Sequence, residues 1–281
     1  MTAVLLGLSA GLAWGLADFV AGLKSRRLTV VVVLLVSQPT GLVVIAAVVL
    51  LSGEPPPEAR FLIYAAVASA AGIAGLAAFY RGLAVGAMAV IAPISATAAV
   101  IPVAVGVASG ERPSALQGLG IALALLGVAL ASRESGEAAE RGGRVAAGVG
   151  LALLAAIGIG TFLAVMDRAS EGGALWATLA SRTTGVTMLV AAALALRPTL
   201  TMEGRDLRGL VAVGVLDVAA NTLFAIATTQ GLVSVVAVLA TLYPLTTIVL
   251  ARLVLGERVG RLQELGGAGA LGGVVLMTVG G

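Results

Sequence analysis

The chain has 281 residues, of which 59% are hydrophobic and 11% are charged, whereas soluble domains carry about 25% charged residues. A water-soluble fold of this size cannot bury so much apolar surface, so the composition excludes a soluble globular protein and indicates one that crosses a membrane several times. The absence of cysteine and histidine excludes disulfides, thiol chemistry, Cys/His metal sites and a histidine proton relay.

The first apolar stretch, residues 2–23, is expected to remain in the protein as a membrane helix. No basic cluster precedes it, and it is long for the apolar region of a signal peptide. Its basic residues, Lys24, Arg26 and Arg27, come after it. These features distinguish it from a cleaved secretion signal.

Apolar stretches of about 20 residues recur along the chain, bounded by charge, proline or glycine, and each is long enough to cross a bilayer. The predicted spans are residues 2–23, 29–51, 59–84, 87–109, 114–132, 145–166, 173–196, 207–229, 232–254 and 260–279. The longest polar connection falls at the middle of the chain. We therefore predict a first five-helix unit at residues 1–133, a polar linker at 134–144 and a second five-helix unit at 145–281.

The second unit repeats the first. Gly86 corresponds to Gly231 at an offset of 145 residues, and the match of SQPTG with SRTTG places Gln38 and Arg182 at equivalent positions in spans 2 and 7. Because each unit has an odd number of spans, the second enters the membrane with the opposite orientation. The predicted fold is therefore an all-α membrane protein with ten transmembrane helices arranged as two inverted five-helix repeats. Such repeats are typical of transporters that bind their substrate between the halves and work by alternating access.

The distribution of basic residues predicts the orientation. The connections between spans 1–2, 3–4, 5–6, 7–8 and 9–10, with their flanks, carry 13 Lys and Arg residues. The opposite side carries only Arg60, Arg112 and Arg168. The positive-inside rule then places both termini outside the cytoplasm.

Few polar side chains lie inside the predicted spans, where each costs about 2.5–3.5 kcal/mol at the centre unless it has a partner or a wet cavity. Asp217 and Asn221 are four residues apart and share a helix face, so they can coordinate an ammonium group or hold a proton. The alternative is an ion pair between Asp217 and Arg182 that only holds helices together. If Asp217 binds substrate, Asp217→Asn should abolish transport and leave the fold intact.

Asp18 is the second intramembrane carboxylate, and it could exchange protons with a cationic substrate. It lies only six residues before Lys24, so a bridge to a basic neighbour is the alternative. Arg182 could clamp a substrate carboxylate or pair with an Asp. The predicted substrate-binding or coupling residues are Asp18, Gln38, Arg182, Asp217 and Asn221.

Other polar and aromatic residues are predicted to shape the cavity. Trp14 lies in the middle of a span, where anchoring at the membrane interface does not explain it. Tyr243-Pro244 is expected to bend span 9, as Pro93 and Pro102 could bend span 4. The predicted cavity-lining residues are Trp14, Tyr80, Arg81, Gln230 and Tyr243.

Glu111-Arg112 and Glu257-Arg258 end spans 4 and 9 at equivalent positions. Each pair is expected to form a salt bridge at the helix end, and the alternative is a gate contact that breaks on opening. Small residues at four-residue spacing, as in Gly266-Ala270, predict helices that approach closely.

The sequence contains no nucleotide-binding loop and no catalytic or metal-binding constellation, so we predict neither an enzyme nor a cofactor. The net charge of +3 rests on few residues in short loops and does not indicate nucleic-acid binding. The predicted partners are a small-molecule substrate and the lipid bilayer. Coupling to protons and uncoupled movement are both consistent with the sequence, as are a monomer and a homodimer.

The chain resembles the EamA-type permeases of the drug/metabolite transporter superfamily. The resemblance rests on the five-plus-five spans, on Trp14-Gly15 with the nearby Lys24, and on the run TLYP…LGE at residues 241–257. It implies a secondary transporter of the bacterial inner (plasma) membrane, commonly an exporter of amino acids or other small metabolites. It also implies a central cavity lined by spans 1–4 and 6–9, with spans 5 and 10 at the periphery.

The resemblance also raises two points of difference. Family members are generally drawn with both termini in the cytoplasm, which the Lys/Arg count contradicts. The first repeat has Thr97-Ala98 where the second has Tyr243-Pro244.

Asp18 is a point of similarity. The four-helix drug exporters of the superfamily carry a carboxylate in their first helix, and Asp18 resembles it.

The predicted function is therefore secondary transport of small polar or amphipathic metabolites, with amino acids as the leading class. Proton-coupled efflux of drugs or lipophilic cations is the main alternative. A channel, a membrane-embedded enzyme and a non-transporting scaffold are the other classes considered.

Overall fold

The computed structural model describes residues 1–25, 27–85, 94–95, 97–131, 142–197, 202–255 and 260–281, in which all regular structure is helical. The elements are α1 (Thr2–Ser25), α2 (Val30–Ser52), α3 (Ala59–Val85), the 3₁₀ helix η1 (Thr97–Ala99), α5 (Val100–Ala108), α6 (Ala115–Ala131), α7 (Gly142–Ser170), α8 (Ala174–Leu196), α9 (Gly204–Thr228), α10 (Val233–Ala240), α11 (Tyr243–Leu255) and α12 (Arg261–Val279).

The helices match the predicted spans. Eight helical segments of the described residues are long and apolar enough to cross a membrane, with α10 and α11 together forming one of them. Two shorter apolar segments, Thr97–Ala108 and Ala115–Ala131, occupy predicted spans 4 and 5. Residues 86–93, including Pro93, lie outside the described ones, so the count of ten spans stays a prediction.

Local chemistry explains where individual helices begin and end. The Thr29 hydroxyl accepts the Val32 amide at 3.4 Å and caps the start of α2. Gly53 ends the same helix in the left-handed region (φ 66°), which glycine adopts without steric cost. The three prolines that follow cannot continue a helix.

The predicted bend in span 9 is confirmed as a break between two helices. α10 ends at Ala240, and α11 begins at Tyr243, so that Pro244 lies in its first turn. There the missing proline amide would have had no intrahelical partner. Pro102 likewise lies in the first turn of α5, which directly follows the 3₁₀ turn η1.

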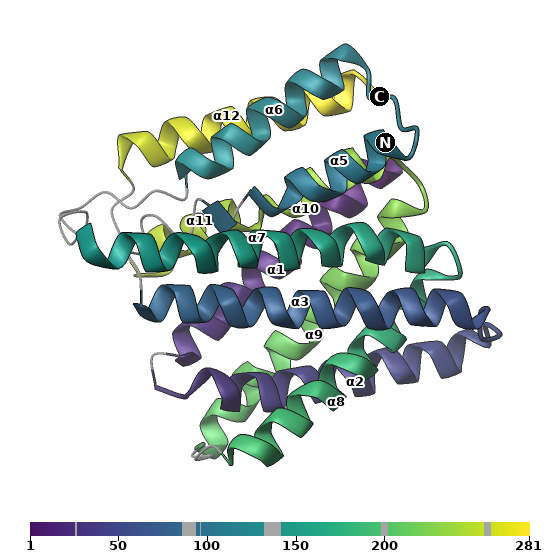
Figure 1. The fold of residues 1–281 in the computed structure, drawn as a ribbon, viewed down its shortest axis with the longest axis vertical. Coiled ribbons are helices and arrows are strands. Elements are labelled where there is room, and N and C mark those ends of the chain that lie inside the picture. Colours follow the sequence, from purple (N-terminus) through teal and green to yellow (C-terminus); the bar gives the residue numbers. More distant parts are fainter. Residues whose placement is uncertain (26, 86–93, 96, 132–141, 198–201, 256–259) are drawn as a thin grey trace.

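Helix packing follows the repeat. α1 packs on α9 as α7 packs on α3, and α2 packs on α9 as α8 packs on α3. α2 packs on its equivalent α8, and α6 on its equivalent α12. In Figure 1, α1 and α7 run in opposite directions, and both termini lie at the same end of the molecule. This is the packing that two inverted repeats related by a pseudo-two-fold axis require.

The pair formed by α6 and α12 lies at one edge of the molecule (Figure 1). Its seam consists of small residues: a methyl group on Gly120 would lie 2.7 Å from the Gly273 carbonyl oxygen, and one on Gly127 would collide with the Ala270 amide. The predicted close approach at Gly266-Ala270 is thus observed. It brings the two backbones together without side chains between them.

Candidate functional site

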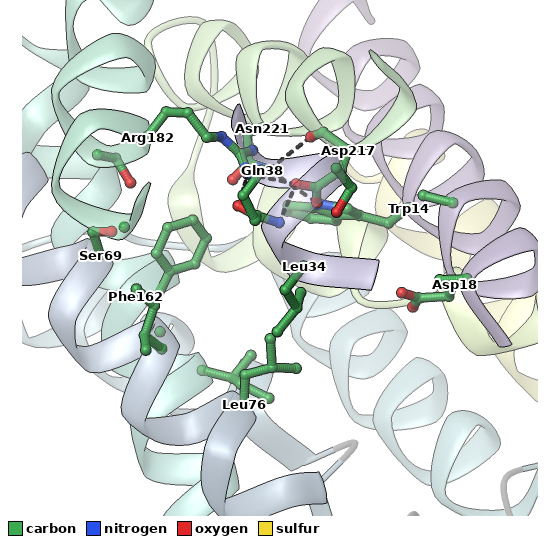
Figure 2. Close-up of a pocket in the computed structure, with 18 of the residues that line it drawn as sticks. Trp14, Asp18, Leu34, Gln38, Ser69, Leu76, Phe162, Arg182, Asp217 and Asn221 are labelled. Carbon is green, nitrogen blue, oxygen red and sulfur yellow. Dashed lines mark hydrogen bonds and ion pairs between the residues drawn. The ribbon is translucent and has the colours of Figure 1, made fainter. Parts of the chain in front are cut away.

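A cavity of about 250 Å³ lies between the two repeats, and its described wall comes from α1, α2, α3, α7, α8, α9 and the α10–α11 junction. Neither α6 nor α12 contributes to this described wall. Much of the wall is apolar, with side chains such as Leu34, Leu76 and Phe162 on one side (Figure 2). Four polar and charged side chains, Gln38, Arg182, Asp217 and Asn221, form a cluster above them in the same view, whereas Ser69 lies beside Phe162.

An ion pair and an amide form the centre of the polar wall. Arg182 on α8 is 7% exposed, and its Nη1 lies 2.7 Å from Oδ2 of Asp217 on α9. The same Arg182 nitrogen donates to Oε1 of Gln38 on α2, and Gln38 Nε2 donates to Asp217 Oδ2 at 3.4 Å. Three helices from both repeats therefore meet in one network (Figure 2).

Asn221 completes this network from the helix that carries Asp217. Its Nδ2 donates to the Asp217 carbonyl oxygen at 2.7 Å and to Asp217 Oδ1 at 3.4 Å. The four-residue spacing that placed both residues on one helix face thus also places their side chains in contact. Asn221 holds the Asp217 carboxylate toward the cavity.

Asp18 lies on the cavity wall one helical turn from Trp14, apart from the network (Figure 2). Its side chain is exposed, and within the described residues it makes no hydrogen bond or ion pair. It forms no bridge to Lys24, and Arg26, another basic neighbour, lies outside the described residues. Lys24 Nζ instead lies 2.9 Å from Oδ1 of Asp206, which ties the end of α1 to the start of α9.

Two aromatic residues of the predicted set line the cavity. Trp14 has its ring 5.9 Å from that of Phe224, which is fully buried in the largest core cluster behind it. Tyr243 lines the wall where α11 begins. The Tyr80 side chain lies outside the described part of the structure.

Two residues of the predicted cavity-lining set, Arg81 and Gln230, do not line the described cavity. Both are exposed. Arg81 lies more than one turn beyond Leu76, the last α3 residue on the wall, and Gln230 follows the end of α9. A position near the end of a span places a polar side chain at the membrane interface, where it needs no cavity.

Sequence reasoning missed several hydroxyl groups on the wall, including those of Ser37 and Ser181. The signal was present, since these serines precede Gln38 and Arg182 in the two aligned motifs and are themselves equivalent. Ser69 and Thr178 also line the cavity and carry no comparable signal.

On the described wall Arg182 is paired with Asp217, and Asp18 is a second acidic side chain that has no such partner among the described residues. The described residues include no group of three or more His, Cys, Asp or Glu side chains that could hold a metal ion. The groups on the wall offer a small molecule charge, hydrogen bonds and apolar contact.

Comparisons with known proteins agree with this architecture. A model of the EamA-like transporter family matches residues 1–133 and 146–279. Among solved structures, 27 chains match, and one, described only as "Crystal structure of protein", has a TM-score of 0.81 at 16% sequence identity and covers 99% of this chain and 96% of its own. At this identity the likeness establishes a shared fold. No curated protein matches.

The family model covers both repeats, and the chain belongs to the EamA-like transporter family. It is thus a multi-pass membrane transporter of the drug/metabolite transporter superfamily, with two inverted repeats in a lipid bilayer and a small molecule as substrate. The family consists of membrane transporters rather than enzymes.

Proposed function

We propose that the protein is a secondary transporter that exports small polar or amphipathic metabolites, with amino acids as the leading class, across a bacterial inner membrane by alternating access. The observation that carries this proposal is the cavity between the inverted repeats, with a charged network from both repeats on its wall. A site between inverted repeats can be exposed to either side when the repeats move relative to each other.

Each end of an amino acid has a matching group on the wall. Its ammonium group fits the carboxylates of Asp18 and Asp217, and its carboxylate fits the Arg182 guanidinium, which has five N–H donors in total. The apolar wall around Phe162 and Leu76 fits a hydrophobic side chain. Asp18 and Asp217 are also the groups through which transport could be coupled to protons.

A second candidate is the efflux of lipophilic cations, which is favoured by Asp18 beside Trp14, since this carboxylate has no partner among the described residues. A cation can interact with both the carboxylate and the indole face. A lipophilic cation has no carboxylate for Arg182 to bind. Arg182 would therefore contact the substrate in amino-acid export and not in cation efflux.

A thermal-stability panel on the purified protein in detergent tests both candidates. A ligand that binds the folded state raises the Tm as its site becomes saturated. The panel contains amino acids, sugars, nucleosides and lipophilic cations. Shifts with amino acids support the first candidate, and shifts with lipophilic cations alone support the second. Flux of the stabilising compound into proteoliposomes then establishes transport, and a binder without flux would contradict the proposal.

A further inference from the structure

Glu111, just beyond the end of α5, caps a helix of the other repeat. Its Oε1 accepts the Val233 amide at 2.5 Å, and its Oε2 accepts the Ser234 amide at 3.1 Å. These are the first two residues of α10, whose own N-cap residue, Leu232, provides no side-chain hydrogen bond. Both carboxylate oxygens are thus used to join the repeats.

The surroundings of Glu111 are shaped for this contact. Its backbone amide donates to the Gly106 carbonyl oxygen at 3.0 Å, and a methyl group on Gly106 would collide with the carboxylate. Within the described residues Glu111 makes no salt bridge with Arg112, so the predicted helix-end pair is wrong for this repeat. A carboxylate at a helix N-terminus gains from charge-assisted hydrogen bonds and from the helix dipole.

The contact lies on the side of the membrane that carries both termini. A methyl group on Gly231, just before α10, would collide with Ala3 near the N-terminus. The cavity is lined instead by the second half of α1 and the first half of α2, which face the opposite side. Fully buried residues of the main core cluster, including Phe224 and Ala237, separate the two regions.

We propose that Glu111 is a positioning residue of the transport cycle, which holds the terminus side of the pathway closed in this state by tying the loop after α5 to the start of α10. The inference rests on alternating access as proposed above. For the terminus side to open, α10 must move away from the first repeat, and the Val233 and Ser234 amides must leave the carboxylate. Glu257, the repeat equivalent of Glu111, lies outside the described residues.

The protein has no cysteine, so a single introduced thiol can report this opening. Ala237, one turn into α10, is fully buried, and Ala237→Cys adds one sulfur atom. The labelling rate of this thiol with a membrane-impermeant maleimide is measured in the parent and in Glu111→Gln. Losing the charge of one partner in a charged hydrogen-bond pair should raise the rate about ten- to a hundredfold.

Two further variants make the result specific. Glu171→Gln is the matched control, because Glu171 is exposed, lies after α7 on the same side and, among the described residues, pairs only with Arg168 at 2.8 Å. Gly106→Ala displaces the Glu111 carboxylate without changing its charge, and it also decides the matter if Glu111→Gln does not fold. Its labelling rate should rise as well.

The proposal is wrong if the rate stays at the parent value in both Glu111→Gln and Gly106→Ala, or if Glu171→Gln raises it equally. Labelling needs no substrate, so its outcome is separate from that of the proposed function. A parent protein without flux but with a faster-labelling Glu111→Gln variant would refute transport and keep the closing contact. Normal flux in the parent protein, together with unchanged labelling in Glu111→Gln and Gly106→Ala, would refute the closing contact alone.

Discussion

Gln38 and Arg182 occupy equivalent positions in the two repeats and contact each other directly, with the Arg182 guanidinium donating to the Gln38 amide oxygen. The pseudo-two-fold axis therefore passes between them. When two repeats exchange conformations, a contact between equivalent residues maps onto itself. We expect this contact to persist in both access states, whereas contacts between non-equivalent residues, such as Arg182 with Asp217, are free to change.

Asp217→Asn should abolish transport and also lower stability. The structure pairs Asp217 with a guanidinium that is 7% exposed, so the substitution leaves a buried charge without its counterion. Breaking such a pair costs about 3 kcal/mol. This differs from the expectation, based on sequence alone, that the fold would remain intact. Denaturant titration in detergent and flux in proteoliposomes measure the two effects, and unchanged flux would remove Asp217 from the site.

The double variant Arg182→Gln/Asp217→Asn is the control for this interpretation. It removes both charges, and the remaining amides can still hydrogen-bond to Gln38 and Asn221. We expect it to be more stable than Asp217→Asn alone, because no unpaired charge stays in the interior. If the loss of stability in the double variant equals the sum of the losses in Asp217→Asn and Arg182→Gln, the pair is not energetically coupled.

Asp18→Asn should have little effect on stability and a large effect on binding. The carboxylate is exposed and has no partner among the described residues, so the free energy of unfolding should change by no more than about 0.5 kcal/mol. The Tm shift produced by an ammonium-bearing ligand should disappear, and Asp18→Glu should restore part of it. A clear loss of stability in Asp18→Asn would instead indicate a structural partner for this group.

Gly127→Ala should destabilise the pair formed by α6 and α12. The added methyl group meets the backbone of Ala270 and Gly266, and overpacking of this kind costs about 1–3 kcal/mol. Gly118→Ala in the same helix is the matched control, since no described atom lies within 4 Å of its added methyl group. There alanine should be neutral or stabilising by up to about 1 kcal/mol. Equal Tm values for the two variants would contradict the tight seam.

A thiol introduced by Ala21→Cys should react from the side opposite the termini. Ala21 is the last α1 residue on the cavity wall, and the connection after α1 belongs to the side rich in Lys and Arg. If the positive-inside rule sets the orientation, an impermeant maleimide labels this thiol in inverted membrane vesicles and not in intact cells. The reverse pattern would support the orientation drawn for the family.

The sequence predicted contacts that follow from symmetry or local spacing. Internal similarity placed Gln38 and Arg182 at equivalent positions near the middle of the membrane, and the four-residue spacing paired Asp217 with Asn221. The break in span 9 followed from Pro244, because a proline removes an amide wherever it lies.

Contacts between residues on helices far apart in the sequence could not be predicted from spacing or internal similarity. Lys24 has a carboxylate six residues before it, yet its partner is Asp206, which is 182 positions away. Helical periodicity shows which residues share a face, but it does not show which other helix that face meets. For the same reason, the sequence could not reveal that Glu111 binds backbone amides of α10, since these donors have no side-chain signature.

The contact between Gln38 and Arg182 also bears on why two repeats in one chain differ from two identical subunits. In a symmetric homodimer, the position on the axis carries the same residue twice. Two arginines there would repel, and two glutamines would bring no charge. A fused chain can place one of each, so that a single guanidinium is solvated by the amide opposite it. Covalent duplication thus permits a single, permanently charged arginine on the symmetry axis, whereas two identical subunits must place either two arginines there or none.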